Sequence, residues 1–559
     1  MESAASKKPQ LKRELTLVQL VFIGVAGALG NGALFGAVGM VTVAGPGAII
    51  AFIFGGAIYV TIALTYMELA RVHPEAGAPS RFSLYSHGRT TSLINSFADI
   101  IWYVFIPPLE ALSIVDGINY LVPGSPLLGA SGYPTAEGVL VGIALVLAFA
   151  PFNYFGVGMF GKSTKYIGAV KLFFYVSMGL GLIFVVHNFG NFANHAYGGF
   201  LPYGAVAILL IMPLTMYDFG GIRVIPDLAG ETRKNEVEKN DAIVKAVGLT
   251  VLFETLIYIS IAVAILASIN WHALGLTPGD YAGLKGAMHG DNPFFILAHS
   301  NGLGIIFIFA VIAGLMAPFV TGYIYSGAGA RIFFSSSRSG FLGSAFKNLH
   351  KRYSVPFWAI ITFAIVGAVT VMISSPAPSV YSVIVDATVA GYLGFSTHPV
   401  AMWVQRRQGV TREDQKFRGA LLYGPIAMGV SSLVVYWSGW PSDPYAMLLI
   451  TIGVIIFGVP FKAFEQVKNS IWYIMYFAFL LVIVFFSKTV GPGTMYGVHV
   501  GFIPFTWGTL ITFLATTLIF FPWGVASGLK EEYYHEEYTA PYRVPQTGAD
   551  GTVVGDGSK

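Results

Sequence analysis

The chain has 559 residues, of which 55% are hydrophobic and only 11% charged, and its mean hydropathy is +0.68. Soluble domains carry about 25% charged residues, so this composition excludes a soluble globular protein and indicates a polytopic, all-α membrane protein. The net charge of +4 matters less than its placement, and the absence of cysteine excludes disulfides and thiolate metal sites.

The N-terminal segment, residues 1–16, is hydrophilic and rich in lysine, and we expect it to be a cytoplasmic tail. The apolar run that follows it, near residues 17–43, is too long for a signal peptide and has no small-residue cleavage site after it. We therefore expect this run to stay in the protein as a signal anchor.

Membrane spans are predicted from the rule that about 20 apolar residues cross the bilayer core as a helix. The fourteen predicted spans lie near residues 17–43, 46–70, 92–121, 137–155, 166–188, 201–229, 242–269, 302–333, 356–374, 379–404, 419–438, 445–461, 470–488 and 505–526.

The distribution of positive charge supports this span count. With the N-terminus in the cytoplasm, all of the 32 lysines and arginines except Lys285 and Lys488 fall in segments on the inner side. Cytoplasmic loops are enriched in lysine and arginine, and a miscounted span would invert every later loop. The pattern therefore predicts fourteen spans with both termini inside.

Two of the predicted spans are interrupted by glycine and polar residues. The first interruption is GALGNGALFG at residues 27–36, and the second is YDFGG at residues 217–221, five spans later. Unpaired backbone groups do not survive in hydrocarbon, so a broken helix there must line a protein cavity or bind a ligand. Interruptions at matching positions of two halves indicate the substrate site of a secondary transporter.

These two interruptions and the turn PEAGAP at residues 74–79 resemble the amino acid–polyamine–organocation superfamily of permeases. The resemblance covers about residues 15–404 and implies the leucine-transporter-type fold of two inverted five-helix repeats, near residues 17–188 and 201–404. The chain departs from the family at Asn31, where serine is commoner, and by having four spans after the tenth instead of two. Residues 405–526 are therefore expected to form four accessory spans.

The interruptions themselves predict an amino acid site. Half-helix N-termini expose amides that suit a carboxylate, free carbonyls suit an ammonium group, and glycine lets the backbone approach a ligand. The predicted substrate-binding residues are Ala28, Leu29, Gly30, Asn31, Gly32, Tyr217, Asp218, Phe219, Gly220 and Gly221. Phe219 or Tyr217 is a candidate gate. The alternative is that the glycines serve close helix packing, as the small-xxx-small pair of Gly32 and Gly36 allows.

Ionisable residues inside spans are costly and are functional by default. Lys171, in the fifth span, matches the position where the resemblance implies a lysine in proton-coupled members and a bound cation in sodium-coupled ones. The alternative is a lysine that snorkels to the cytoplasmic interface. Glu110 is a possible cavity acid, and the other intramembrane candidates, with structural pairing as the alternative for each, are Asp116, Asp218, Glu254 and Asp386.

The enzymatic and nucleotide-binding patterns in the sequence lack the context that they need. Residues 156–163 (GVGMFGKS) match the phosphate-loop pattern, but they fill a predicted loop of about ten residues between two spans, without the strand and α/β domain that the motif needs. His187 and His195 fit no zinc spacing, so no metal site is expected. No cofactor, nucleotide or nucleic acid is expected either. The tail at 527–559 is expected to be a disordered cytoplasmic extension, with docking of residues 531–538 under the protein as the alternative.

The sequence therefore predicts a secondary active amino acid transporter of the plasma membrane, working by alternating access, with residues 17–404 as its core and a proton as the expected coupling ion. A polyamine or organic cation carrier, and an amino acid exchanger or sensor on the same fold, are the alternatives. The expected partners are an amino acid and the lipid bilayer, and no catalytic residue is expected.

Overall fold

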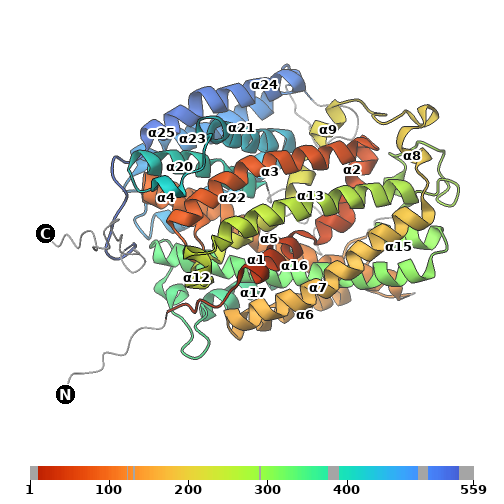
Figure 1. Ribbon diagram of the computed structural model, residues 1–559, viewed down its shortest axis with the longest axis horizontal. Helices are drawn as coiled ribbons and strands as arrows, with labels where there is room; N and C mark the ends of the chain where they lie inside the picture. Colours follow the sequence, from red (N-terminus) through yellow and green to blue (C-terminus); the bar gives the residue numbers. More distant parts are fainter. Residues whose placement is uncertain are drawn as a thin grey trace.

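The computed structural model describes residues 10–122, 124–129, 132–288, 291–374, 389–488 and 501–539, and long helices dominate these ranges. Most of the long helices lie side by side along one axis, as a bundle (Figure 1). Nine of the described helices are long and apolar enough to cross a membrane. They are α3 (Gly47–Val72), α5 (Arg89–Leu121), α6 (Ala136–Tyr154), α7 with its last turn (Val157–Val186), α13 (Ala242–Ser268), α16 (Gly304–Arg338), α21 (Ala420–Ser438), α23 with the turn before it (Val467–Phe486) and α24 through α25 (Phe505–Ser527).

The first predicted span is a bent pair. α1 (Leu17–Ala28) and the helical stretch Gly32–Ala44, which contains α2 (Ala37–Ala44), meet at 48° and together make a tenth crossing. α1 begins at a capping box in which the Gln19 amide donates to Thr16 Oγ1 (3.4 Å) and the Thr16 amide donates to Gln19 Oε1 (2.9 Å). These bonds satisfy amides that the first turn of a helix leaves open.

The other predicted spans are shorter or interrupted helices. Residues 201–229 contain α9 (Val206–Leu210), α10 (Met212–Asp218) and α11 (Gly221–Asp227). α17 (Phe357–Ser374) and α22 (Ser442–Gly458) are short apolar helices, and residues 379–404 lie partly outside the described residues before α19 (Ala390–Phe395) and α20 (Thr397–Arg407). A multi-pass helical membrane protein is thus confirmed, whereas the count of fourteen stays a prediction.

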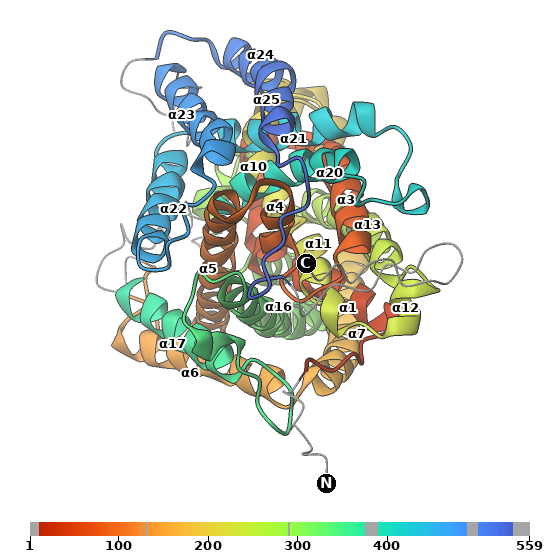
Figure 2. The ribbon, with the colours of Figure 1, turned by 90° about the vertical axis from the view of Figure 1, so that its left-hand side faces the viewer.

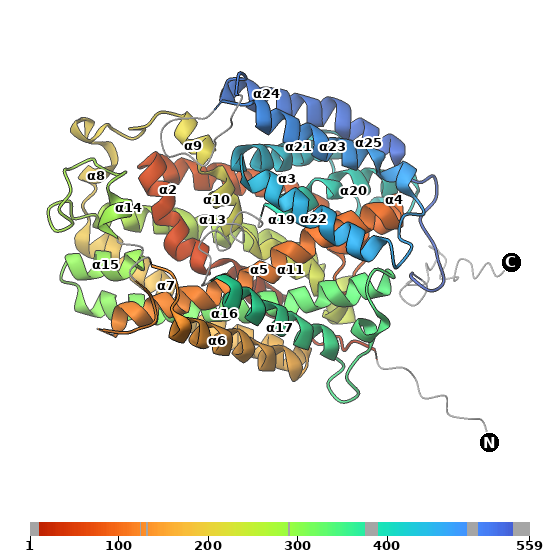
Figure 3. The same cartoon turned by 180° about the vertical axis from the view of Figure 1, so that it is seen from behind.

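The chain enters α1 and leaves α25 (Phe521–Ser527) at the same end of the bundle. The short helices α4 (Pro79–His87) and α12 (Lys234–Glu238) lie at this end, and α8 (Gly190–Ala193), α14 (Leu284–Ala287) and α15 (Pro293–Ser300) lie at the other (Figures 1 and 3). Lys285, one of the two cations predicted to lie outside, is on α14. An even number of crossings follows from this arrangement.

The middle of the bundle holds the interrupted helices. Viewed along the bundle, α1, α11 and α16 lie near the centre, with α6 and α17 at one edge and α22, α23 and α24 at another (Figure 2). α1 packs against α13, α11, α7 and α16. Large apolar side chains of the peripheral helices are exposed, among them Leu140, Leu421, Ile455 and Leu518. Such a surface requires hydrocarbon around it.

Two expectations about connecting segments are wrong. The segment that carries the phosphate-loop pattern is mostly helix, because α7 begins at Val157 directly after Gly156, where φ is 102°. The described part of the tail, as far as Thr539, is docked and not solvated: the Leu529 amide donates to Ser86 O (2.8 Å), the Tyr533 amide to Tyr85 O (3.0 Å), and Arg81 Nη2 to Tyr538 O (2.9 Å). The backbone of α4 therefore has a partner in the tail. Residues 540–559 of the predicted tail lie outside the described residues.

Candidate functional site

The first interruption lies where the sequence predicts it. α1 ends at Ala28, Leu29 leaves the helical conformation with ψ 67°, and the helix resumes at Gly32. The Gly30 amide turns back to Ala28 O (2.9 Å). The absence of a side chain at Gly30 leaves room for the Glu110 carboxylate, because a Cβ there would overlap it. The sequence thus allows another helix to approach the bare backbone of the break.

The second interruption falls between α10 and α11. α10 ends at Asp218, Phe219 caps it, and α11 starts at Gly221. The Gly220 amide donates to Tyr217 O at 3.2 Å, which closes a tight turn instead of continuing the helix. The ten predicted substrate-binding residues therefore all lie at, or next to, a helix break.

Tyr258 of α13 joins the two breaks. Its hydroxyl lies 2.9 Å from Ala28 O and 2.7 Å from Asp218 O, the carbonyls at the ends of α1 and α10. A second link is the hydroxyl of Tyr217, which donates to Asn31 Oδ1 (3.3 Å). Asp218 Oδ1 lies where a Cβ of Gly32 would stand. The structure thus brings both groups of predicted residues into one place, where Asn31 and Tyr217 are the half-buried members.

Glu110 occupies the N-terminus of the second half of the first broken helix. The Asn31 amide donates to both of its carboxylate oxygens, at 3.2 and 2.9 Å. We expected this amide to be open for a substrate carboxylate, but it already has a partner from α5. A carboxylate at the positive end of the helix dipole is favourable, so the geometry shows what kind of group the position accepts.

Lys171 of α7 lies against the break in α1 and does not reach the surface. Its ammonium donates to Ala26 O (2.6 Å), Ala317 O (2.9 Å) and Thr321 Oγ1 (3.0 Å), and the residue is 0% exposed. These three partners use all three of its N–H groups. The snorkelling alternative is therefore wrong, and the ammonium is a fixed cation between α1 and α16.

The remaining intramembrane acids have different surroundings. Asp218 does not pair with Arg223: that guanidinium forms a buried ion pair with Asp99 and lies over the Trp102 ring at 5.0 Å. Glu254 is fully buried on α13. Asp116, on α5, is partly buried, and Asp386 lies outside the described residues.

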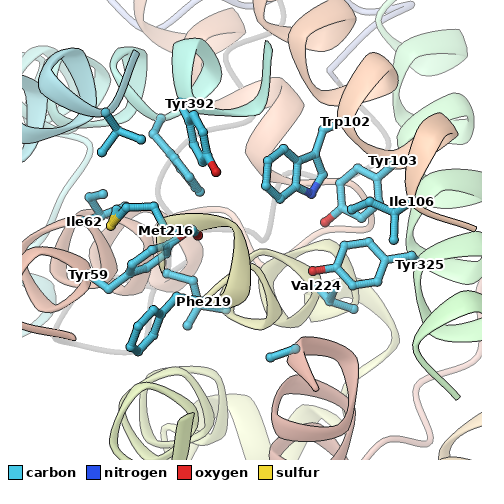
Figure 4. Packing of buried hydrophobic residues seen from close by; sticks show 14 of the residues in the cluster. Tyr59, Ile62, Trp102, Tyr103, Ile106, Met216, Phe219, Val224, Tyr325 and Tyr392 are labelled. Carbon is cyan, nitrogen blue, oxygen red and sulfur yellow. The ribbon is translucent and has the colours of Figure 1, made fainter. Parts of the chain in front are cut away.

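Aromatic side chains surround the second break (Figure 4). Phe219 is buried and stacks on Tyr59 (centroids 5.2 Å), so in this conformation it is a packed core side chain and not an open gate. The ring centroids of Tyr217 and Trp102 are 5.6 Å apart, and the Trp102 ring in turn contacts that of Tyr392 (centroids 5.5 Å apart). The half-buried Tyr217 is thus the better placed of the two predicted gate residues.

The PEAGAP turn closes the end of the bundle that carries α4. Glu75 accepts bonds from Arg81 Nε (3.0 Å), Arg338 Nη2 (2.8 Å) and the Tyr85 hydroxyl (2.6 Å). Burial raises the pKa of Glu75, but Arg81, Arg338 and Tyr85 outweigh it and lower the pKa to about 2. Gly77, with φ 65°, donates its amide to Asp227 O (2.9 Å). This turn therefore ties α4 to the ends of α11 and α16.

Sequence reasoning missed Tyr258 and Thr321. A tyrosine in an apolar helix looks like packing, and only its hydroxyl partners show its role. The signal that was available is that Tyr258 follows the intramembrane acid Glu254 by one helical turn, which puts both on one face.

The fold and the site define a multi-pass membrane protein in which two broken helices meet at a buried polar centre. A family model described as "Amino acid permease" matches residues 19–409. The chain belongs to this amino acid permease family.

Relatives are similar over most of their length. The chain is 26% identical to the glutamate/serine transporter AimA of Bacillus subtilis over 94% of this chain and 95% of that protein. It is 24% identical to the aspartate-proton symporter of the same organism, over 85% of this chain and 91% of that protein. It is 22% identical to the aromatic amino acid transport protein AroP of Salmonella typhimurium, over 83% of this chain and 97% of that protein.

Proposed function

We propose that this protein is a secondary active transporter that moves amino acids across the plasma membrane by alternating access, coupled to protons. The observation that carries the proposal is the meeting of the two broken helices at Tyr258, with the predicted residues Ala28–Gly32 and Tyr217–Gly221 around it. The family and the names of its relatives support an amino acid as substrate.

The substrate is held at the backbone of the breaks in this proposal. The Asn31 amide donates to a carboxylate, as its bonds to Glu110 illustrate. A substrate carboxylate takes this place when Glu110 withdraws, and the half-buried Tyr217 covers the bound molecule. Residues 17–404 are the transport core, in two inverted repeats, and residues 405–526 are accessory helices.

Lys171 is the proposed coupling residue. It binds Ala26 O of α1 and Ala317 O of α16, so its ammonium holds the two helices together. Loss of its proton would remove one of these bonds and loosen α1 from α16. The name of the aspartate-proton symporter supports coupling to protons in a relative of this chain.

Uptake into proteoliposomes tests the proposal. The purified protein should accumulate one or more labelled amino acids from a panel that includes glutamate, aspartate, serine and the aromatic residues, and it should do so only with the pH gradient imposed. Uptake of polyamines but of no amino acid would favour the organic cation carrier, which the buried acids Glu110, Asp218 and Glu254 also suit. Substrate binding or exchange without accumulation would favour the exchanger or sensor.

The role of Lys171 has its own test. Lys171→Ala and Lys171→Arg should both exchange labelled substrate and accumulate less of it than the unaltered protein at a given pH gradient, because neither residue releases a proton at accessible pH. Lys162→Ala, an exposed lysine on the same helix, should behave as the unaltered protein. Gradient-driven accumulation by Lys171→Arg to the level of the unaltered protein would contradict the coupling role.

Orientation is tested with single cysteines, since the chain has none. A cysteine at Lys285, on α14, should react with a membrane-impermeant reagent in intact cells. One at Arg412, which is 62% exposed, should not react. The reverse pattern would place both termini outside.

A further inference from the structure

Two acids beside the second break have carboxyl groups without partners. Asp218 is 1% exposed and Glu254 is 0% exposed, and among the described residues none donates a hydrogen bond to any of their four carboxyl oxygens. A buried carboxylate normally has hydrogen-bond or charge partners, because removing it from water without them is costly. Structural pairing therefore does not account for these two groups.

The glycines of the breaks make room for both carboxyls. Asp218 Oδ1 lies where a Cβ of Gly32 would stand, and Glu254 Oε1 lies where a Cβ of Gly221 would stand, beside Gly24 O. Tyr258, one turn after Glu254, is bonded to the carbonyl of Asp218 (2.7 Å). The Asp218 carboxyl thus lies against the backbone of the first break, and the Glu254 carboxyl lies against the backbone of the second.

The nearby cations are already engaged. Lys171 has its three bonds to α1 and α16, and Arg223 has its ion pair with Asp99. The other titratable groups around the breaks include Glu110 on α5, Tyr175 on α7, Tyr217 on α10, Tyr258 on α13, Tyr325 on α16 and Tyr392 on α19. Ionised together, Glu110, Asp218 and Glu254 would leave two negative charges in excess over Lys171. An uncompensated second negative charge in a buried cluster is costly, so at least one of these carboxyls holds a proton.

We propose that Asp218 and Glu254 form a proton-binding pair that carries a coupling proton of its own, separate from Lys171. This inference rests on the proposed proton-coupled amino acid transport. A proton from the water on one side adds to a carboxylate oxygen of the pair while the breaks are open to that side. The same proton returns to water when the breaks open to the other side. The pair is placed for this exchange because Asp218 is itself the last residue of α10.

A proton fits this place better than a metal cation. A sodium ion would need several free oxygens around it, including carbonyls. The Tyr258 hydroxyl already binds Ala28 O and Asp218 O, and Lys171 already binds Ala26 O. The four carboxyl oxygens have no partner among the described residues, and a carboxylate oxygen is the acceptor that a proton needs.

The test measures how steep a substrate gradient the pH gradient can balance. The protein is reconstituted in liposomes with the membrane voltage clamped at zero, and the substrate ratio that gives no net flux is found for a pH difference of one unit. Each coupled proton multiplies this ratio by about ten, because one pH unit is a tenfold difference in proton activity. Glu254→Gln should lower the ratio about tenfold, and Glu137→Gln, an exposed acid on α6, should leave it unchanged.

The outcomes separate the pair from the proposed function. Exchange of labelled substrate without any gradient tests the amino acid site alone, and its absence for every amino acid would refute the proposed function. An unchanged balancing ratio in Glu254→Gln, with exchange intact, would overturn the pair. A ratio that follows a sodium gradient instead of the pH gradient would also overturn it and assign the carboxyls to sodium.

A measurement on the unaltered protein covers the case in which Glu254→Gln does not fold. Infrared spectra at pH 7 should show the carbonyl band of a protonated carboxyl, and Asp218→Asn should weaken this band. The absence of the band from the unaltered protein would overturn the proposal.

Discussion

Replacing Glu75 by Gln should destabilise the closed end of the bundle by about 3 kcal/mol at pH 7. The carboxylate is 5% exposed and lies between Arg81 and Arg338, which with Tyr85 hold its pKa at about 2 against an ordinary 4.5, although burial acts in the opposite direction. One pKa unit corresponds to 1.36 kcal/mol, so a depression of about 2.5 gives about 3 kcal/mol. This value agrees with the cost of removing one partner of a buried ion pair, which is about 3–5 kcal/mol.

The pH dependence of this loss follows from the sign of the pKa change. Because the folded pKa is depressed, the carboxylate contributes stability above about pH 4.5, and this contribution is lost as the pH falls toward 2. The difference in unfolding free energy between the unaltered protein and Glu75→Gln should therefore shrink to about 1.4 kcal/mol at pH 3.

The measurement is reversible unfolding in detergent micelles, followed by circular dichroism at pH 7 and pH 3. Glu413→Gln is the control, because Glu413 also pairs with a cation (Lys416, 2.5 Å) but is 90% exposed, and such pairs contribute about 0–1 kcal/mol. A loss in Glu75→Gln no larger than in the control, or one that does not decline with pH, would refute the reasoning.

Three further changes test the breaks and the tail. Gly30→Ala should abolish substrate binding in a calorimetric titration, because its Cβ would take up the space where the Glu110 carboxylate now lies and where the substrate carboxylate is proposed to bind, whereas Gly39→Ala meets only an ordinary contact at 3.4 Å and should bind normally; equal losses would indicate general packing damage. Tyr258→Phe should lower the unfolding free energy by about 1–3 kcal/mol, because the buried carbonyl of Asp218 loses its hydroxyl partner while Ala28 O keeps only the Gly30 amide, and no change would contradict the link between the breaks. Truncation after Gly528 should lower the thermal midpoint, because it removes the bonds of the tail to α4, whereas truncation after Thr539 should not; equal midpoints would show that the docked segment contributes nothing.

The two breaks were predictable because glycine and polar residues are costly inside an apolar run unless the helix is interrupted there. GALGNGALFG and YDFGG both stand where the structure interrupts its helices. The burial of Lys171 was one of two open alternatives, since a lysine near a helix end reaches water or protein equally well. The three oxygens that decide it come from residues 26, 317 and 321, which only the fold brings together.

The partners of the buried acids could not be read from the sequence. Arg223 is near Asp218 in the chain, yet it pairs with Asp99 of another helix. The docked tail was missed for a different reason: its bonds to α4 are made largely by backbone amides, as at Leu529 and Tyr533, which any sequence provides. A polar composition therefore does not distinguish a docked tail from a solvated one.

The three bonds of Lys171 have a consequence for the medium in which the protein works. A dissolved ion that bridged Ala26 O and Ala317 O would come and go with its concentration outside the cell. The ammonium is covalently attached to α7, so its local concentration is fixed by the chain, and dilution does not remove it. The contact between α1 and α16 should accordingly hold in fresh water and in brine alike, and transport should need no particular alkali metal in the surroundings.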